Sequence, residues 1–272
     1  MEFVERINAL LEPVIAVARQ AGETIREIYE AGQYQQITKS DNTPVTSADL
    51  AAHQLIVSKL TELAPDIPIL SEEDADIPLA KRHDWRRYWL IDPLDGTQEF
   101  IAGSGDFAVN IALIDDHHPV MGVVYAPMTG VCYFGVSGNG SFKRVDGVDI
   151  PIHSRDAKQA EEEMVIAVSR RQKLEAVTEL LEPGRNYRFV PFGSASLKSC
   201  MVAEGEADVY LRLGPTGEWD TGASQCIVEQ AGGRILDTRL QPLSYNERES
   251  LENPNYLVLG APGLPWNQIL QG

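Results

Sequence analysis

Hydrophobic residues recur every three or four positions along two segments near the start of the chain. From about residue 3 to residue 29 they form one stripe, which predicts an amphipathic helix that Pro13 should bend or interrupt. The same spacing returns over residues 47–63, after a polar stretch at residues 39–44 that predicts a turn. Two helices are therefore expected before the first strand.

Short apolar runs follow, and they are typical of β-strands. Residues 67–70 and 88–91 each precede acidic residues, so the pattern places carboxylates at the ends of two strands. Between residues 107 and 142, turn signals separate further β-rich runs and predict an antiparallel meander. These runs cover residues 108–114, 120–125 and 131–136.

The pattern changes beyond the polar segment at residues 155–163. Strands and helices now alternate, with elements predicted at residues 164–168, 174–181, 187–190, 196–203, 208–211, 221–231 and 256–259. Because no Pro/Gly/Ser-rich tether separates the two patterns, we expect one domain over residues 1–272. Its N-terminal lobe would span about residues 1–153 and its C-terminal lobe about residues 154–272.

Composition and charge narrow the class of protein. The formal charge of −17 over 272 residues argues against nucleic-acid binding, because phosphate backbones would be repelled. Three cysteines without a CxxC pair argue against a disulfide framework. With no secretory signal and no apolar run near ~18 residues, we expect no membrane span and a cytoplasmic location, or a peripheral one at the inner face of the membrane.

The segment DPLDGT, residues 92–97, is the first candidate for chemistry. If a strand ends at Ile91, Asp92 and Asp95 project from a short loop, and their spacing lets two carboxylates and one carbonyl converge on hard cations. Residues 98–101 would then form a short helix whose free amide groups receive a phosphate. An ordinary acidic turn followed by a helix cap would account for the same six residues equally well.

Three further fragments are ambiguous when taken singly. Glu72 and Glu73 follow a predicted strand and could bind Mg²⁺ or belong to a solvated loop. Asp220 could be a ligand or the N-cap of the helix that follows it. Asp49 could belong to a capping motif at the start of its helix.

Together, in this order, the fragments resemble the lithium-sensitive phosphatases of the inositol monophosphatase family. Within that family the sequence is most similar to the 3′(2′),5′-bisphosphate nucleotidases, through residues 40–49, 69–74, 88–97, 109–114, 122–127 and 214–216. The resemblance implies an α+β fold, a layered αβαβα sandwich. It also implies hydrolysis of adenosine 3′,5′-bisphosphate to AMP and phosphate.

The resemblance further assigns roles to individual residues. Two or three Mg²⁺ ions would be held by Glu72, Asp92, the carbonyl of Leu94, Asp95 and Asp220. The catalytic group would consist of Asp49, Glu72 and Thr97, with Thr97 polarised by Asp49 to position the attacking water. Substrate contacts would come from Glu72, Leu94, Asp95, Gly96, Thr97, Ser196, Lys198, Arg212 and Asp220, with Lys198 and Arg212 meeting the second phosphate.

Three positions depart from the nucleotidase pattern. Gln98 stands where a lysine is usual, Ala195 replaces a serine, and residues 221–224 differ from the usual TAAG, ending in Ser224. An inositol monophosphatase or a fructose-1,6-bisphosphatase-like sugar phosphatase therefore remains open, as does a non-catalytic member that binds nucleotide or metal. The expected partner is a small phosphorylated molecule, and the chain is expected to be a monomer or homodimer.

Overall fold

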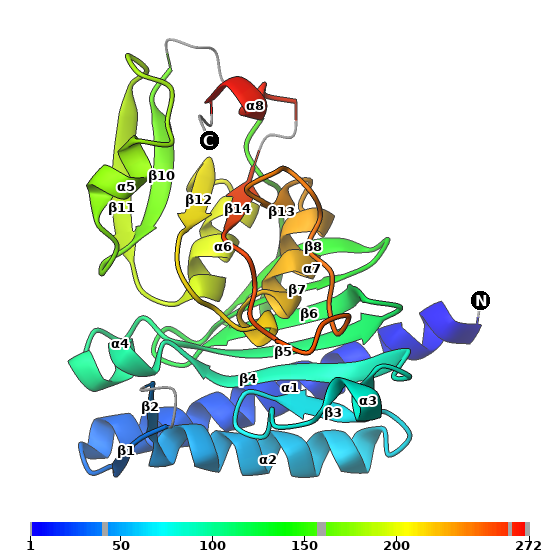
Figure 1. The fold of residues 1–272 in the computed structure, drawn as a ribbon. Coiled ribbons are helices and arrows are strands. Elements are labelled where there is room, and N and C mark those ends of the chain that lie inside the picture. Colours follow the sequence, from blue (N-terminus) through cyan, green and yellow to red (C-terminus); the bar gives the residue numbers. More distant parts are fainter. Residues whose placement is uncertain (1, 40–42, 157–161, 261–262, 270–272) are drawn as a thin grey trace.

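The computed structural model describes residues 2–39, 43–156, 162–260 and 263–269, and its elements stack in five layers (Figure 1). Helices α1 (Glu2–Ala31) and α2 (Ser47–Leu63) cover the outer face of a seven-stranded sheet. Helices α6 (Ala195–Ala203) and α7 (Gly222–Gln230) lie between this sheet and a five-stranded one. The short helices α5 (Leu174–Thr178) and α8 (Trp266–Ile269) form the last layer. The predicted αβαβα sandwich is confirmed.

The seven-stranded sheet follows the order of the chain. Its strands are β3 (Ile69–Ser71), β4 (Arg87–Asp95), β5 (Ala108–Asp115), β6 (His118–Ala126), β7 (Val131–Val136), β8 (Gly140–Val145) and β9 (Val148–Ile152). Only the β3–β4 pair is parallel; β4 to β9 form an antiparallel meander. The predicted meander is confirmed, and it is longer than expected.

The five-stranded sheet mixes directions. Its order is β11 (Tyr187–Phe192), β10 (Met164–Ser169), β12 (Val209–Arg212), β14 (Tyr256–Leu259) and β13 (Arg234–Asp237). Strand β10 is parallel to both neighbours, while β14 runs antiparallel to β12 and β13. We call the part from α1 to β9 the N-terminal lobe and the part from β10 to α8 the C-terminal lobe.

Strand β4 shows how one apolar run serves two cores. Trp89 and Ile91 face α1 and α2, whereas Tyr88 and Leu90 face the core shared with α6 and α7. Successive side chains of a strand point to opposite faces, so a sheet covered on both sides needs a continuous apolar sequence. A third core packs Val177, Leu211 and Trp266 beneath the outer helices.

Two local features differ from the sequence pattern. Helix α1 continues through Pro13, so the predicted interruption is wrong; burial of its apolar face along the sheet offsets the backbone bond that proline removes. The polar region before α2 forms a hairpin of β1 (Gln36–Thr38) and β2 (Pro44–Thr46), although residues 40–42 of the predicted turn lie outside the described residues. The same holds for residues 157–161 within the polar segment 155–163.

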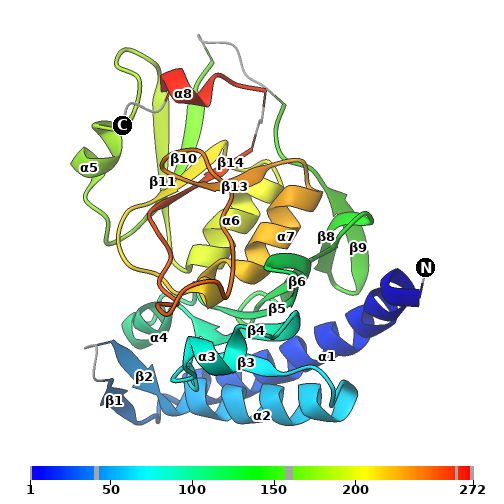
Figure 2. The same ribbon diagram turned by 45° about the vertical axis from the view of Figure 1, so that its right-hand side comes forward.

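Helix α7 lies unusually close to the seven-stranded sheet, as both ribbon views show (Figures 1 and 2). A Cβ atom added at Gly122 in β6 would approach the carbonyl oxygen of Ala223 to 2.0 Å. Glycine therefore permits this contact, because any side chain would push the helix away. The contact fixes the start of α7, and with it the preceding Asp220, over the sheet.

An ion pair on the same helix gives a pH-dependent prediction. His118 Nε2 lies 2.9 Å from Glu229, and this hydrogen bond raises the pKa of His118 above its ordinary value of about 6.5. The bond therefore stabilises the fold below about pH 6.5 and is lost as pH rises through the folded-state pKa. We expect His118→Gln to lower the melting temperature at about pH 6 and to have no effect near pH 9. A deficit that persisted at pH 9 would contradict this.

In the ranges described above, no helix combines the length and apolar character that crossing a membrane requires.

Candidate active site

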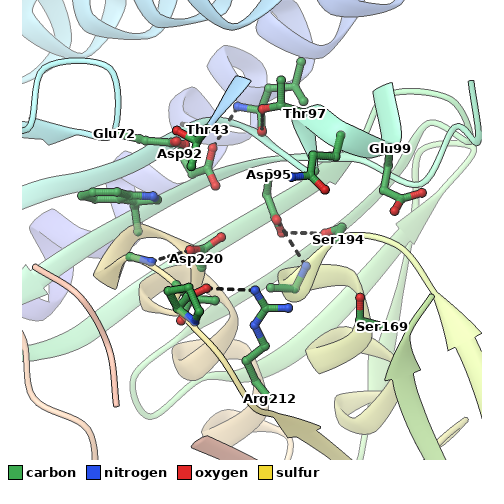
Figure 3. A pocket seen from close by; sticks show the side chains of 18 of the residues that line it. Thr43, Glu72, Asp92, Asp95, Thr97, Glu99, Ser169, Ser194, Arg212 and Asp220 are labelled. Carbon is green, nitrogen blue, oxygen red and sulfur yellow. Dashed lines mark hydrogen bonds between the residues drawn. The ribbon is translucent and has the colours of Figure 1, made fainter. Parts of the chain in front are cut away.

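A cleft of about 670 Å³ opens where the two lobes meet (Figure 3). One wall comes from the end of β4 and from α4 (Thr97–Ala102), with Glu72 behind them. The other comes from the start of α6, from the 3₁₀ turn η1 (Glu218–Asp220) and from residues 249–252, between β13 and β14. Acidic side chains gather at the bottom of this cleft.

Asp92, Asp95 and Asp220 form the acidic centre. Each offers one carboxylate oxygen, and the three oxygens lie within 4.8 Å of one another. Asp92 and Asp95 are buried, and Asp220 arrives from the other lobe on η1. The sequence prediction that these three residues share one site is consistent with this geometry.

The backbone that carries the first two aspartates differs from the predicted loop. Strand β4 does not end at Ile91 but continues to Asp95. Asp92 pairs with Asn110 and Asp95 with Ala108, so β4 holds one more residue than β5 over this stretch. Such a β-bulge accommodates Pro93, which has no N–H for the ladder, and directs both carboxylates into the cleft. The predicted strand end is therefore wrong, although its carboxylates are placed as expected.

Burial and mutual repulsion both disfavour the charged form of these carboxylates. Burial raises the pKa of Asp92 well above its ordinary value, and the neighbouring carboxylates raise it further. The pKa of Asp220 is raised in the same way, by burial and then by Asp95 and Glu72. Clustered carboxylate oxygens are the ligands that Mg²⁺ prefers, and a divalent ion removes their mutual repulsion. The donor set therefore fits magnesium.

Glu72 extends the acidic centre on the β3 side. It follows β3 directly, and in Figure 3 its side chain lies beside Asp92. Burial raises the pKa of Glu72, whereas the ammonium of Lys39, 3.0 Å away, lowers it. The same ammonium lies 2.8 Å from Glu73, which ties the β1–β2 hairpin to the cleft. Lys39 was not predicted, because nothing in its local sequence marks it.

Asp49 serves both of the roles that the sequence left open. Its Oδ2 accepts hydrogen bonds from the backbone N–H (2.7 Å) and hydroxyl (2.6 Å) of Thr46, completing a capping box at the start of α2. Its Oδ1 accepts a hydrogen bond of 2.8 Å from the hydroxyl of Thr97. Burial raises the pKa of Asp49, while these donors favour the carboxylate. One helix cap thus orients a hydroxyl in the cleft.

Gly96 makes the sharp turn between β4 and α4. Its φ of 100° lies in the left-handed region that favours glycine, and a Cβ there would approach the carbonyl oxygen of Asp106 to 3.2 Å. The turn places Gly96, Thr97 and the carbonyl-bearing Leu94 along the cleft. The predicted short helix after this turn is confirmed as α4.

The C-terminal lobe holds Asp95 through the start of α6. Asp95 Oδ2 accepts hydrogen bonds from the hydroxyls of Ser194 and Ser196, each at 2.6 Å, and from the N–H of Ser196 at 2.8 Å. The N–H of Ala195 reaches Oδ1 at 3.2 Å. The Ala195 departure therefore leaves this contact intact, because it uses the backbone. Ser196 is fully buried behind Asp95, whereas the sequence analysis placed it in contact with the substrate.

Lys198 and Arg212 both line the cleft, as expected, but in different ways. Lys198 is buried, and its ammonium donates to the carbonyls of Phe192, Gly193 and Ser194. Burial lowers the pKa of Lys198 to about 8. Arg212 donates to the carbonyl of Pro215 at 2.9 Å and lies below Asp220 in Figure 3.

Asp220 caps its own 3₁₀ turn, since its Oδ2 accepts from the N–H of Gly217 at 2.7 Å. It does not cap α7, whose N-cap is Thr221. Ser224, the last of the departures, is buried in α7 and donates to the carbonyl of Thr221, 3.2 Å away, so it contributes to the helix and does not line the cleft.

Sequence reasoning missed Arg171 and the segment between β13 and β14. Arg171 follows β10, and both of its terminal nitrogens donate to Gln98, one of them to the carbonyl oxygen at 3.0 Å. Residues Glu249, Leu251 and Glu252 close the opposite side of the cleft. Neither feature has a local sequence signal, because both depend on how the lobes pack.

Comparisons with known proteins agree with this geometry. The model of the "Inositol monophosphatase family" matches residues 7–261. The 3′(2′),5′-bisphosphate nucleotidase CysQ of Aggregatibacter actinomycetemcomitans is 47% identical over 96% of this chain and 96% of its own length. The protein of that name from Escherichia coli K12 is 43% identical over 92% and 99%.

A solved structure is similar throughout as well. CysQ from Bacteroides thetaiotaomicron, described as a bacterial member of the inositol monophosphatase family, superposes with a TM-score of 0.78 at 37% identity. The similarity covers 92% of this chain and 96% of that one. The resemblance drawn from the motifs is thereby confirmed. This chain belongs to the inositol monophosphatase family of metal-dependent phosphatases.

Proposed function

We propose that this protein is a Mg²⁺-dependent 3′(2′),5′-bisphosphate nucleotidase that converts adenosine 3′,5′-bisphosphate to AMP and phosphate. The proposal is supported by relatives of that name that match nearly the whole chain. The observation that carries it is the acidic centre of Asp92, Asp95 and Asp220 beside an intact Thr97–Asp49 hydrogen bond. A family member that only binds its ligand, without catalysis, would not need the Thr97–Asp49 pair.

We assign the metal ligands to Asp92, Asp95, Asp220, Glu72 and the carbonyl of Leu94, for two or three ions. When bound, Mg²⁺ supplies charge neutralisation for the phosphate and lowers the pKa of a bound water. The residues present suit this task because they are oxygen donors, largely buried, and mutually repulsive without a cation.

The N-terminal lobe supplies the groups that handle the attacking water. The Thr97 hydroxyl donates its proton to Asp49, so its lone pairs face outward as acceptors for the water. Glu72 would accept one proton of the water as the water oxygen bonds to phosphorus, and the ribose 3′ oxygen would take up a proton from solvent as its bond to phosphorus breaks. We assign the phosphate oxygens to the N–H groups of Gly96 and Thr97, since both residues line the cleft at the start of α4.

The C-terminal lobe shapes the substrate side. Arg212 is proposed to contact the second phosphate, since a guanidinium can bind phosphate through two parallel hydrogen bonds. The contacts of Ser196 and Lys198 favour a structural role. Ser196 donates hydrogen bonds to Asp95, and Lys198 donates to the three carbonyls of residues 192–194.

Phosphate release from three substrates tests the proposal. Adenosine 3′,5′-bisphosphate should be hydrolysed with at least about tenfold higher kcat/KM than inositol 1-phosphate or fructose 1,6-bisphosphate, since a tenfold preference needs only about 1.4 kcal/mol of added contacts. Release should require Mg²⁺ and fall when lithium is added. A preference for either other substrate would replace the nucleotide assignment. Absence of Mg²⁺-dependent release from all three would defeat the enzyme assignment.

A further inference from the structure

Three basic side chains line the cleft in the part of the chain that the structure describes: Lys198, Arg171 and Arg212. All three contact the protein's own groups, and they differ in burial and in the acceptors that they meet. Lys198 donates to three carbonyls and lies over the ring of Tyr210, 5.0 Å from its centroid. Arg212 is partly buried, which lowers its pKa, but the net pKa is raised by Tyr210 and Tyr256 and, to a smaller extent, by Asp220 and Asp95.

Arg171 differs from both because it stands at the rim of the cleft. Its side chain is 46% exposed and extends from the end of β10 across to α4 on the other lobe. There it donates to the side chain and backbone carbonyl of Gln98, and its second terminal nitrogen lies 3.5 Å from Glu99. Glu99 is shared with Arg170, 3.4 Å away. The solvent-accessible guanidinium of Arg171 therefore lies beside Gln98, the residue that follows Thr97.

The position of Gln98 shows where the Arg171 guanidinium lies relative to the acidic centre. Gln98 lines the cleft directly after the residues that face the acidic centre, and it carries no charge of its own. Arg171 thus brings a positive charge to the α4 rim from a different part of the chain.

We propose that Arg171 acts beside Arg212 in binding the substrate phosphate that is not cleaved, and that Arg171 determines the preference for bisphosphates over monophosphates. This inference rests on the proposed function. The cleaved phosphate must lie at the acidic centre, so a second phosphate on the same ribose lies away from it, towards the rim. The guanidinium would exchange its hydrogen bonds to the neutral Gln98 for bonds to a dianionic phosphate, which are stronger because they are charge-assisted, while Arg170 continues to pair with Glu99. In a protein with a formal charge of −17, such a local cation matters for an anionic ligand.

Steady-state kinetics with adenosine 3′,5′-bisphosphate and adenosine 3′-monophosphate test the inference. Arg171→Ala should lower kcat/KM for the bisphosphate on the order of 10- to 100-fold, mostly through KM, and change the monophosphate value less than about threefold. Arg171→Gln, which keeps hydrogen-bonding capacity without the charge, should show the same loss of selectivity. Adding Gln98→Lys to Arg171→Ala should restore part of it, since an ammonium then returns to the same rim.

The matched control is Arg188→Ala, which removes an exposed arginine that pairs with Glu163 outside the cleft and should leave both substrates unaffected. An equal loss on both substrates would overturn the inference and make Arg171 a latch between the lobes. Unchanged kinetics in Arg171→Ala would overturn it as well. If the wild-type protein releases phosphate from neither nucleotide, the proposed function itself fails, and the wild-type measurement separates that outcome from the others.

Discussion

Asp92→Asn is expected to abolish phosphate release and, at the same time, to raise the melting temperature of the metal-free protein. The activity falls because the proposed metal site loses one of its ligands, which removes several kcal/mol of charge stabilisation, or roughly 10³-fold in rate. The stability rises because a neutral amide avoids burying a charge and no longer repels the neighbouring carboxylates, which are the two causes, burial first, that raise the pKa of Asp92. Its Oδ1 can still accept the 3.0 Å hydrogen bond from the N–H of Leu94. Each kcal/mol gained should appear as about 2–4 °C.

Thermal melting with and without Mg²⁺, alongside phosphate release, measures both effects. Mg²⁺ should raise the melting temperature of the wild-type protein much more than that of the variant, because only a bound ion stabilises the fold. Glu27→Gln removes the same unit of charge from the exposed surface of α1 and should change neither quantity. A lower melting temperature for metal-free Asp92→Asn would show that the acidic centre is not under electrostatic strain.

Thr97→Val should lower kcat by about 10²- to 10⁴-fold while leaving KM within a few-fold of the wild-type value. The reason is that the hydroxyl acts on the attacking water, which counts in the transition state far more than in substrate binding. The hydroxyl has one strong partner, Asp49, at 2.8 Å, so valine leaves the shape but removes the acceptor for water. Thr97→Ser should recover most of the turnover.

Thr46→Ala provides the structural counterpart. It removes one of the two Thr46 donors to Asp49, and it breaks the capping box of α2, so stability should fall by about 1 kcal/mol. Its effect on kcat should be far smaller than that of Thr97→Val, since the Thr97–Asp49 bond remains. If both variants lowered kcat equally, the role of Asp49 would be to hold the helix start, and the water-positioning role of Thr97 would be withdrawn.

Much of the N-terminal lobe could be predicted because its signals are local. Helix α2 combines a capping box with a period that buries Ala52, Ile56 and Leu60, and it begins and ends where the sequence indicated. The meander was readable for a similar reason, since turn residues separate its β-rich runs. Carboxylates that follow apolar runs likewise indicated where the acidic centre lies, because a strand end and an acidic residue are both visible in a short stretch of sequence.

The remaining features depend on contacts between distant segments. The end of the apolar run at Ile91 indicated the end of a strand, but pairing with β5 carries β4 on through a bulge to Asp95. The protein contacts of Ser196 and Lys198 could not be predicted for a comparable reason. Both are buried by packing that joins α6 to β4 and β12, and no local pattern reveals which acceptors such packing presents. The Arg171–Gln98 contact spans 73 residues of sequence and belongs to the same class.

The hydrogen bonds around Asp95 have a consequence for how the whole chain unfolds. Its carboxylate belongs to β4, yet the hydroxyl and amide groups that fix it belong to Ser194, Ala195 and Ser196 at the start of α6. Separating the lobes would therefore break the hydrogen bonds of the Asp95 carboxylate and move Asp220 away from it. A cation bound there would hold the two lobes together, and its binding free energy would add to the free energy of unfolding of the whole molecule. Metal binding and the integrity of both halves thus become one equilibrium.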